Sequence, residues 1–89
     1  MKAEKGWSVS IAIDEHEGRT RAKAQLFGDG NSEMVGVGLA RLNPTDLDVP
    51  AIGDELAVAR ALADLSHQLI DATAADIENI TKIPPHLEV

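Results

Sequence analysis

The sequence predicts an α+β fold, with a three-stranded antiparallel β-meander followed by one long C-terminal helix or by two consecutive helices. Residues 6–42 contain runs in which apolar and polar side chains alternate, as in strands with one buried face. Residues 53–81 repeat apolar side chains every three or four positions, as an amphipathic helix does. Because 89 residues suffice for only one hydrophobic core, residues 1–89 are expected to form a single domain.

The first two strands are expected over about residues 6–14 and 19–28, joined by a hairpin. An apolar row in the first strand predicts one buried face, and its members are Trp7, Val9, Ile11 and Ile13. The polar segment Asp14–Gly18 ends on glycine, which tolerates the left-handed conformation that tight turns need. The second strand sets another apolar row against polar neighbours, and this row consists of Ala22, Ala24 and Leu26.

The third strand is expected over about residues 33–42, after a turn at Gly28–Ser32 that is rich in residues tolerant of positive φ. One face of this strand is bulky and carries Val35, Val37 and Leu39. The other face is nearly bare and carries Gly36, Gly38 and Ala40. A bare face lets a helix or another backbone approach closely. The pattern leaves open which of the two faces turns inward.

A helix is expected over about residues 53–81, after a loop at residues 43–52 that prolines bracket. Its apolar stripe consists of Val58, Leu62, Leu65 and Leu69. A bend near residues 71–74 would divide the segment into two consecutive helices, and both arrangements stay open. Residues 82–89, which contain two adjacent prolines, are expected to form a tail.

Composition excludes several classes of protein. The chain has no cysteine, which excludes disulfides, thiolate metal sites and cysteine nucleophiles. Its N-terminal segment is charged rather than signal-like, and no apolar run approaches the ~18 residues of a membrane-spanning helix. We therefore expect a cytoplasmic protein without membrane contact. The net charge of −7 lies in residues 44–89, with nine acids and two bases, whereas residues 1–43 balance six with six.

No catalytic, metal or cofactor site is expected. The cluster Asp14–Glu17 predicts a solvated hairpin rather than a metal site, because adjacent ligands in a tight turn point in divergent directions. His67 and His86 are single histidines for which the sequence names no acid–base partner. The segments Gly28–Gly30 and Gly36–Gly38 lack the lysine of a phosphate-binding loop. The sequence thus predicts a protein that is not an enzyme and has no known small-molecule substrate.

The remaining candidate is a row of basic side chains, Arg19, Arg21 and Lys23, which the third strand could extend through Arg41. Alternate residues of a strand project to the same side, about 7 Å apart, so these cations would stand in line. That spacing suits contacts with RNA phosphates. The alternative is a solvated outer face that keeps a short sheet from aggregating.

Three segments resemble a known family: Trp7–Ala22 (WSVSIAIDEHEGRTRA), Val35–Pro44 (VGVGLARLNP) and Pro50–Leu65. On these residues the chain resembles the small actinobacterial proteins grouped as domain of unknown function 1876. The resemblance implies a fold similar to double-stranded-RNA-binding-domain-like proteins, dimers in at least some members, and an association with stress, hypoxia and dormancy. Some members of that family look like ribosome hibernation promoting factors. The resemblance assigns no catalytic residues.

Two functional hypotheses follow. The first is a dimeric stress-associated protein that contacts ribosomal RNA or a ribosomal protein through Arg19, Arg21, Lys23 and Arg41. The second is a structural or protein-interaction dimer without nucleic-acid contact. Both include self-association, because the chain has only two aromatic residues and few other large side chains with which to fill a core.

Overall fold

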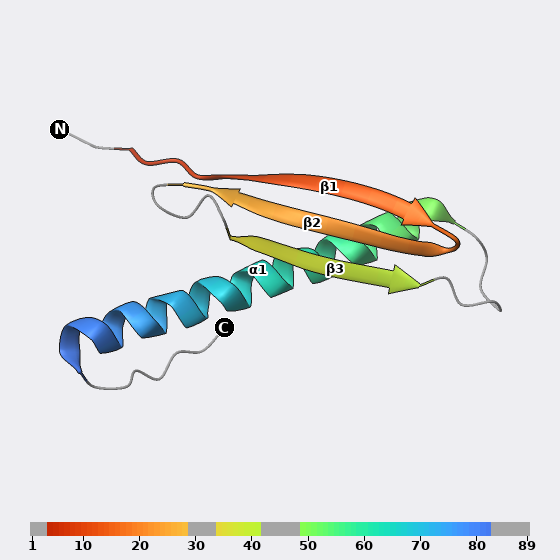
Figure 1. Cartoon of the computed structure of the whole chain (residues 1–89). Coiled ribbons are helices and arrows are strands. Elements are labelled where there is room, and N and C mark those ends of the chain that lie inside the picture. Colours follow the sequence, from red (N-terminus) through yellow and green to blue (C-terminus); the bar gives the residue numbers. More distant parts are fainter. Residues whose placement is uncertain (1–3, 29–33, 42–48, 83–89) are drawn as a thin grey trace.

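The described part of the chain consists of three antiparallel strands and one long helix, in the order β1 (Ser8–His16), β2 (Arg19–Phe27), β3 (Val35–Arg41) and α1 (Pro50–Thr81). The computed structural model describes residues 4–28, 34–41 and 49–82. The sheet order is β1-β2-β3, and α1 crosses one face of the sheet obliquely (Figure 1). The α+β class agrees with the prediction, and of the two helical arrangements left open by the sequence the structure has the single helix.

The β1–β2 hairpin is tighter than predicted. Its turn consists of Glu17 and Gly18 alone, with φ values of 51° and 75°. Two successive residues with positive φ match the twist of the flanking strands, so β1 continues to His16 instead of ending near Asp14. The prediction that Asp14–Gly18 forms the hairpin connection is therefore wrong for Asp14–His16, which belong to β1. The register then places Asp14 opposite Arg21.

The core lies between α1 and the two strands beneath it. Its buried apolar side chains are Ala22, Ala24, Leu26, Ala40, Ala57, Ala61 and Leu65, with Met34, Val58 and Leu69 packed against them. Alanine dominates because the helix lies close to the sheet. The bare face of β3 is the one that turns inward: a side-chain carbon on Gly36 would collide with the backbone oxygen of Ala61, and one on Gly38 with that of Ala57.

The helix also covers the outer edge of β3. Three helix side chains, one turn apart, bond to successive outward-facing backbone groups of that strand. Arg60 Nη1 donates to the Leu39 oxygen at 2.6 Å, Val37 N donates to Asp64 Oδ2 at 2.8 Å, and Gln68 Nε2 donates to the Val35 oxygen at 2.7 Å. Four residues of helix rise about 6 Å and two residues of strand rise about 6.6 Å. The spacing of the three helix side chains therefore matches the spacing of the backbone groups that they contact on β3. This edge is thereby protected from pairing with another chain.

Helix α1 begins earlier than predicted and does not divide. It starts at Pro50, a residue type suited to the first helical turn, and it runs without interruption through residues 71–74. It ends at Thr81, and Lys82 adopts a left-handed conformation and donates its backbone N–H to the Glu78 oxygen. The rest of the expected loop, the turn before β3 and the tail lie largely outside the described residues. No helix in the described ranges is apolar and long enough to cross a membrane.

The apolar row of β1 is not buried, contrary to the prediction. Val9, Ile11 and Ile13 are paired with the buried residues of β2 and so point to the helix side of the sheet. They nevertheless remain 40–45% exposed, because α1 packs over β2 and β3 and contacts β1 only slightly. Trp7, whose ring packs on Gly28, is 54% exposed. One third of the sheet therefore has no helix above it.

Candidate polyanion-binding surface

The face of the sheet that points away from α1 carries all four of the predicted contact residues. Buried and exposed residues alternate along β2, with Ala22 and Ala24 on the helix side, so Arg19, Arg21 and Lys23 point outward. Arg41 is exposed at the end of β3 and is paired with Arg19. We call this side of the three strands the outer face. Its described residues include four cations and one carboxylate, that of Asp14.

A row of three basic side chains crosses the outer face at one end. His16 on β1 is paired with Arg19 on β2, which is paired in turn with Arg41 on β3. Directly opposed residues of an antiparallel pair stand about 5 Å apart, and like charges at that distance destabilise the sheet. Within the described residues, Arg19 and Arg41 have no carboxylate partner. We call His16, Arg19 and Arg41 the basic row.

Arg21 differs from its neighbours because its guanidinium group is paired with a carboxylate. Its Nη2 and Nε atoms donate to Asp14 Oδ2 at 3.0 and 3.3 Å, across the β1–β2 pair. Both side chains are about half exposed, so solvent screens this ion pair. The pair still occupies the guanidinium group that was predicted to contact phosphate. The four predicted residues therefore share one face, but only three of them have cationic groups without a described partner.

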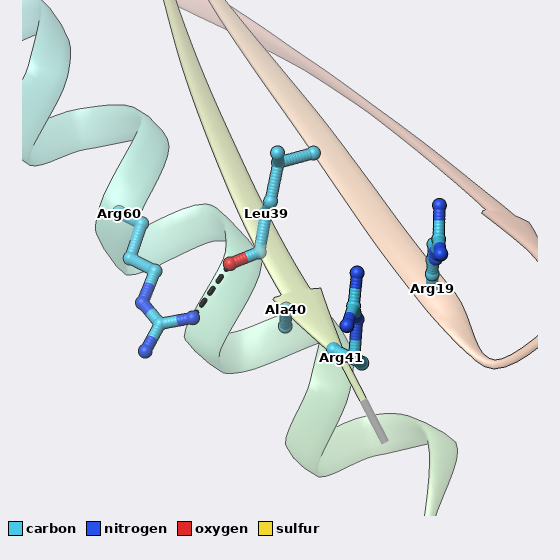
Figure 2. A pocket seen from close by; sticks show the side chains of 5 residues that line it. All are labelled: Arg19, Leu39, Ala40, Arg41 and Arg60. Atoms are coloured by element: carbon cyan, nitrogen blue, oxygen red, sulfur yellow. Dashed lines mark hydrogen bonds between the residues drawn. The ribbon is translucent and has the colours of Figure 1, made fainter. Parts of the chain in front are cut away.

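An open pocket of about 260 Å³ lies beside the basic row and is lined by Arg19, Leu39, Ala40, Arg41 and Arg60. Arg19 and Arg41 stand side by side and point the same way (Figure 2). Arg60 reaches β3 from the helix, and its hydrogen bond to the Leu39 oxygen fixes its position (Figure 2). Three of the five residues that line the pocket are thus arginines, and guanidinium is the side-chain group best suited to bidentate binding of phosphate.

Charge is separated between the two layers of the molecule. Helix α1 carries six carboxylates and one arginine, which gives it a net charge of −5. The carboxylates are those of Asp54, Glu55, Asp64, Asp71, Asp76 and Glu78. The positive outer face points away from this acidic layer. A protein with a net charge of −7 can therefore present a positive field on one side.

Aromatic residues in the described part of the chain do not form a base-stacking platform on the outer face. Phe27 follows the buried Leu26 and therefore points outward, whereas Trp7 packs on Gly28 at the helix side. The other exposed apolar groups of the outer face are Val37 and Leu39, on the strand next to the cations. The geometry thus favours contacts with phosphate groups over stacking with bases.

Two members of this surface were not predicted from the sequence. His16 was assigned to a turn, and only the two-residue hairpin brings it beside Arg19. Arg60 was treated as a helix residue, although its four-residue spacing with Asp64 and Gln68 was a signal for a shared contact along β3. Among the described residues, no three His, Asp or Glu side chains lie close enough to hold a metal ion.

Comparison with known proteins places the chain among mycobacterial relatives. It is 58% identical over 81 residues to the uncharacterized protein Mb1767 of Mycobacterium bovis, covering 91% of this chain and 85% of that protein. It is 57% identical over 76 residues to the uncharacterized protein Rv2632c of Mycobacterium tuberculosis, covering 85% and 81%. The crystal structure of Rv2632c superposes with a TM-score of 0.83 at 52% identity, over 93% of this chain and 98% of that one.

These findings correct the resemblance drawn from the sequence. The family model that matches is described as Rv2632c-like and not as domain of unknown function 1876. The relatives named above carry no link to ribosome hibernation promoting factors, so the hibernation role that the resemblance implied is withdrawn. The mycobacterial relatives do confirm the actinobacterial relationship. With residues 5–86 matched by the family model, the chain belongs to the Rv2632c-like family.

Proposed function

We propose that this protein is a non-enzymatic, cytoplasmic binding protein whose outer face binds the phosphate backbone of RNA. The observation that carries the proposal is the basic row. His16, Arg19 and Arg41 are aligned across the three strands, and the repulsion between the directly opposed Arg19 and Arg41 destabilises the sheet unless an anion lies over them. An RNA backbone offers a line of phosphates, and a flat sheet can contact several of them together.

The position of the other charges supports the same proposal. Lys23 continues the cationic surface along β2, and Arg60 is a third arginine in the lining of the pocket. The acidic helix occupies the opposite layer, which leaves the outer face free to approach a polyanion. Because Phe27 is the one aromatic side chain among the described residues of this face, we expect little sequence preference and strong salt dependence.

The proposal is tested by measuring the affinity for a single-stranded RNA oligonucleotide over a range of salt concentrations. Replacing Arg19 and Arg41 by glutamine removes two phosphate contacts, so we expect about tenfold weaker binding at low salt. The slope of log K against log salt should also become shallower, by about 1 for each residue. Lys82→Gln, which removes one charge at the far end of the helix, is the matched control and should bind as the wild type does.

The same experiment has a built-in check on folding. Arg19 and Arg41 are directly opposed like charges, so the double variant should be at least as resistant to thermal unfolding as the wild type. Weaker binding then reports the lost contacts and not a lost fold. Absence of RNA binding by the wild-type protein, or binding that neither salt nor the Arg19→Gln/Arg41→Gln change affects, would overturn the proposal.

Asp14→Asn should strengthen RNA binding. The substitution removes the only carboxylate among the described outer-face residues and frees the Arg21 guanidinium for phosphate. We expect a few-fold gain in affinity and a salt slope steeper by about 1. Folding stability should fall by less than about 1 kcal/mol, because the ion pair is solvent-exposed. The matched control is Glu55→Gln on the helix, for which an equal gain would show that net charge alone is responsible.

A second candidate function is a protein-interaction module without nucleic-acid contact. The exposed apolar row of β1 favours it, since contiguous apolar surface marks interaction sites. Affinity capture with and without ribonuclease separates the two candidates: a partner that is retained after RNA is digested favours the protein-interaction module. We also propose that the fold is similar to that of double-stranded-RNA-binding-domain-like proteins. This similarity would favour RNA binding, the first candidate function.

A further inference from the structure

The outer face has two chemically different ends. The basic row and Arg21 lie at the end nearest the β1–β2 turn, and Lys23 is the last charged residue along β2. Beyond Lys23 the described strand residues of this face are neutral. They are Ser8 and Ser10 on β1, Gln25 and Phe27 on β2, and Val35 on β3. The outer face therefore changes from cationic to neutral along β2, and we call the second part the neutral end.

Phe27 is the aromatic residue of the neutral end. It follows Leu26, which is 3% exposed, and so points away from the helix, where it is 42% exposed. The residue directly opposite on β1 is Ser8, whose short side chain cannot cover an aromatic ring. Trp7 packs on Gly28 at the helix side, so the two rings lie on opposite sides of the sheet. Phe27 therefore presents ring surface to solvent on the same side of the sheet as the cations.

The neutral end lies in line with the cations along one strand. Lys23 and Phe27 are four residues apart on the same face, about 13 Å between Cα atoms, and the flexible stem of the lysine can bring its ammonium group closer to the ring. From Arg19 to Phe27 the face extends about 27 Å. This length corresponds to about eight nucleotides at a stacked spacing of about 3.4 Å, and to fewer in an extended strand. One RNA strand can therefore lie over both ends at once.

We propose that Phe27 stacks on one base of a single RNA strand whose phosphates lie on the basic row. This inference rests on the proposed function and names its substrate class, which is single-stranded RNA. The bases of a duplex are stacked on one another, whereas a single strand can turn a base toward an aromatic ring. One ring takes one base and is no platform for several. Because every base has an aromatic face, the contact adds affinity without a sequence code.

Neutral polar side chains border the ring and suit a base. Ser8 lies opposite Phe27, and Ser10 is the next outward residue along β1; both are exposed. Serine hydroxyl groups donate and accept hydrogen bonds, so they can bond to the edge of any base without favouring one. The described strand residues at this end include no carboxylate, so a negatively charged strand meets no repulsion from them. The neutral end therefore accommodates a base, and the cationic end accommodates phosphates.

Phe27→Ala tests the base contact in the full-length protein, with a single-stranded RNA of about ten nucleotides as the probe. We expect about tenfold weaker binding, because the stacking of one base on an aromatic side chain contributes this much or more. The slope of log K against log salt should stay as in the wild type, since no cation is lost. Binding of inorganic polyphosphate, which has phosphates but no bases, should not change.

Further variants separate the ring from apolar bulk. Phe27→Leu keeps an apolar side chain without a ring and should bind RNA as weakly as Phe27→Ala, whereas Phe27→Tyr should bind as the wild type does. These two variants keep a large side chain, so their comparison does not depend on the stability of Phe27→Ala. The matched control is Val37→Ala, which shortens a 43% exposed apolar side chain of the same face and should leave RNA binding unchanged.

Tryptophan fluorescence reports the contact directly. Trp7 is the one tryptophan of the chain and packs at the helix side, so the emission of the wild type should change little when RNA binds. Phe27→Trp places a second indole in the proposed contact. Single-stranded RNA should quench its emission, whereas polyphosphate should not, and an RNA duplex of the same length should quench it far less.

The outcomes distinguish the base contact from phosphate binding by the basic row. RNA affinity that Phe27→Ala and Phe27→Leu leave unchanged, or no quenching of Phe27→Trp, would overturn the base contact and leave phosphate binding standing. Polyphosphate binding that weakens in Phe27→Ala as much as RNA binding would overturn it too, because polyphosphate has no base. Absence of RNA binding by the wild type would overturn the proposed function itself, and the base contact with it.

Discussion

Replacing Gly38 by valine should destabilise the protein by about 3 kcal/mol or more. Any side-chain carbon at this position collides with the Ala57 oxygen, and the colliding atoms are backbone atoms of α1 that no rotamer change can move. The helix would have to lift away from β3, which breaks the packing of Ala57 and Ala61 together. Overpacked cores typically lose 1–3 kcal/mol, and contact with backbone belongs at the upper end of that range.

Chemical denaturation followed by circular dichroism measures this loss. Gly6→Val is the matched control, because a side-chain carbon at Gly6 meets nothing within 4 Å. Its stability should stay within about 0.5 kcal/mol of the wild type. If the Gly38→Val protein unfolds at the same denaturant concentration as the control, the backbone of α1 does not lie against β3.

Leu65→Ala should lower the free energy of unfolding by about 3 kcal/mol. Leu65 is 4% exposed and, with Leu26, is one of two leucines among the seven buried apolar residues that the structure describes. The remaining five are alanines, which cannot expand to fill the space that the substitution leaves. For a small domain this is a large share of a total stability of about 5 kcal/mol or slightly more.

Leu62→Ala is the matched control for this substitution. Leu62 belongs to the same apolar stripe predicted from the sequence, but it is 41% exposed in the structure. Denaturation of both variants at one protein concentration should show a loss below about 1 kcal/mol for Leu62→Ala. Equal losses at the two positions would mean that α1 is rotated about its axis, so that Leu62 shares the core with Leu65.

The order of the elements and the three strands could be predicted because each depends on local patterning, whereas the pattern left open whether one or two helices follow. Alternation in β2 identified its buried row correctly, and the glycines of β3 indicated a close backbone approach. The pattern could not predict what covers β1. The alternation of Val9, Ile11 and Ile13 with smaller residues predicts a strand with one apolar side. Whether a helix of the same chain covers that side depends on the direction in which α1 crosses the sheet.

The helix stripe shows a related limit. Large residues such as Val58 and Leu62 dominate the apolar periodicity, so the sequence places them in the core. The structure buries Leu65 of that stripe and packs Val58 and Leu69 against the core, but it leaves Leu62 exposed and fully buries Ala57 and Ala61, because a nearly bare strand brings the helix close. The helical periodicity therefore identified the helix correctly, but it placed the centre of the buried face too close to the bulkier residues.

The candidate site was predicted in part. Strand alternation placed Arg19, Arg21 and Lys23 on one face, as found. The pairing of Arg21 with Asp14 depends on a two-residue turn, and glutamate is an unusual first residue for such a turn, so the hairpin signal was weak. The same tight turn brings His16 into the basic row, which only the observed register reveals.

The central claim, that the basic row binds RNA phosphates, is tested most directly by two-dimensional NMR of the protein during titration with single-stranded RNA. We expect the backbone amide signals of His16, Arg19 and Arg41 to shift, and the shifts to vanish when salt is added. Signals from Ala63 and Ile70 on the helix should stay in place. Shifts confined to the helix, or no shifts at low salt, would contradict RNA binding by the basic row.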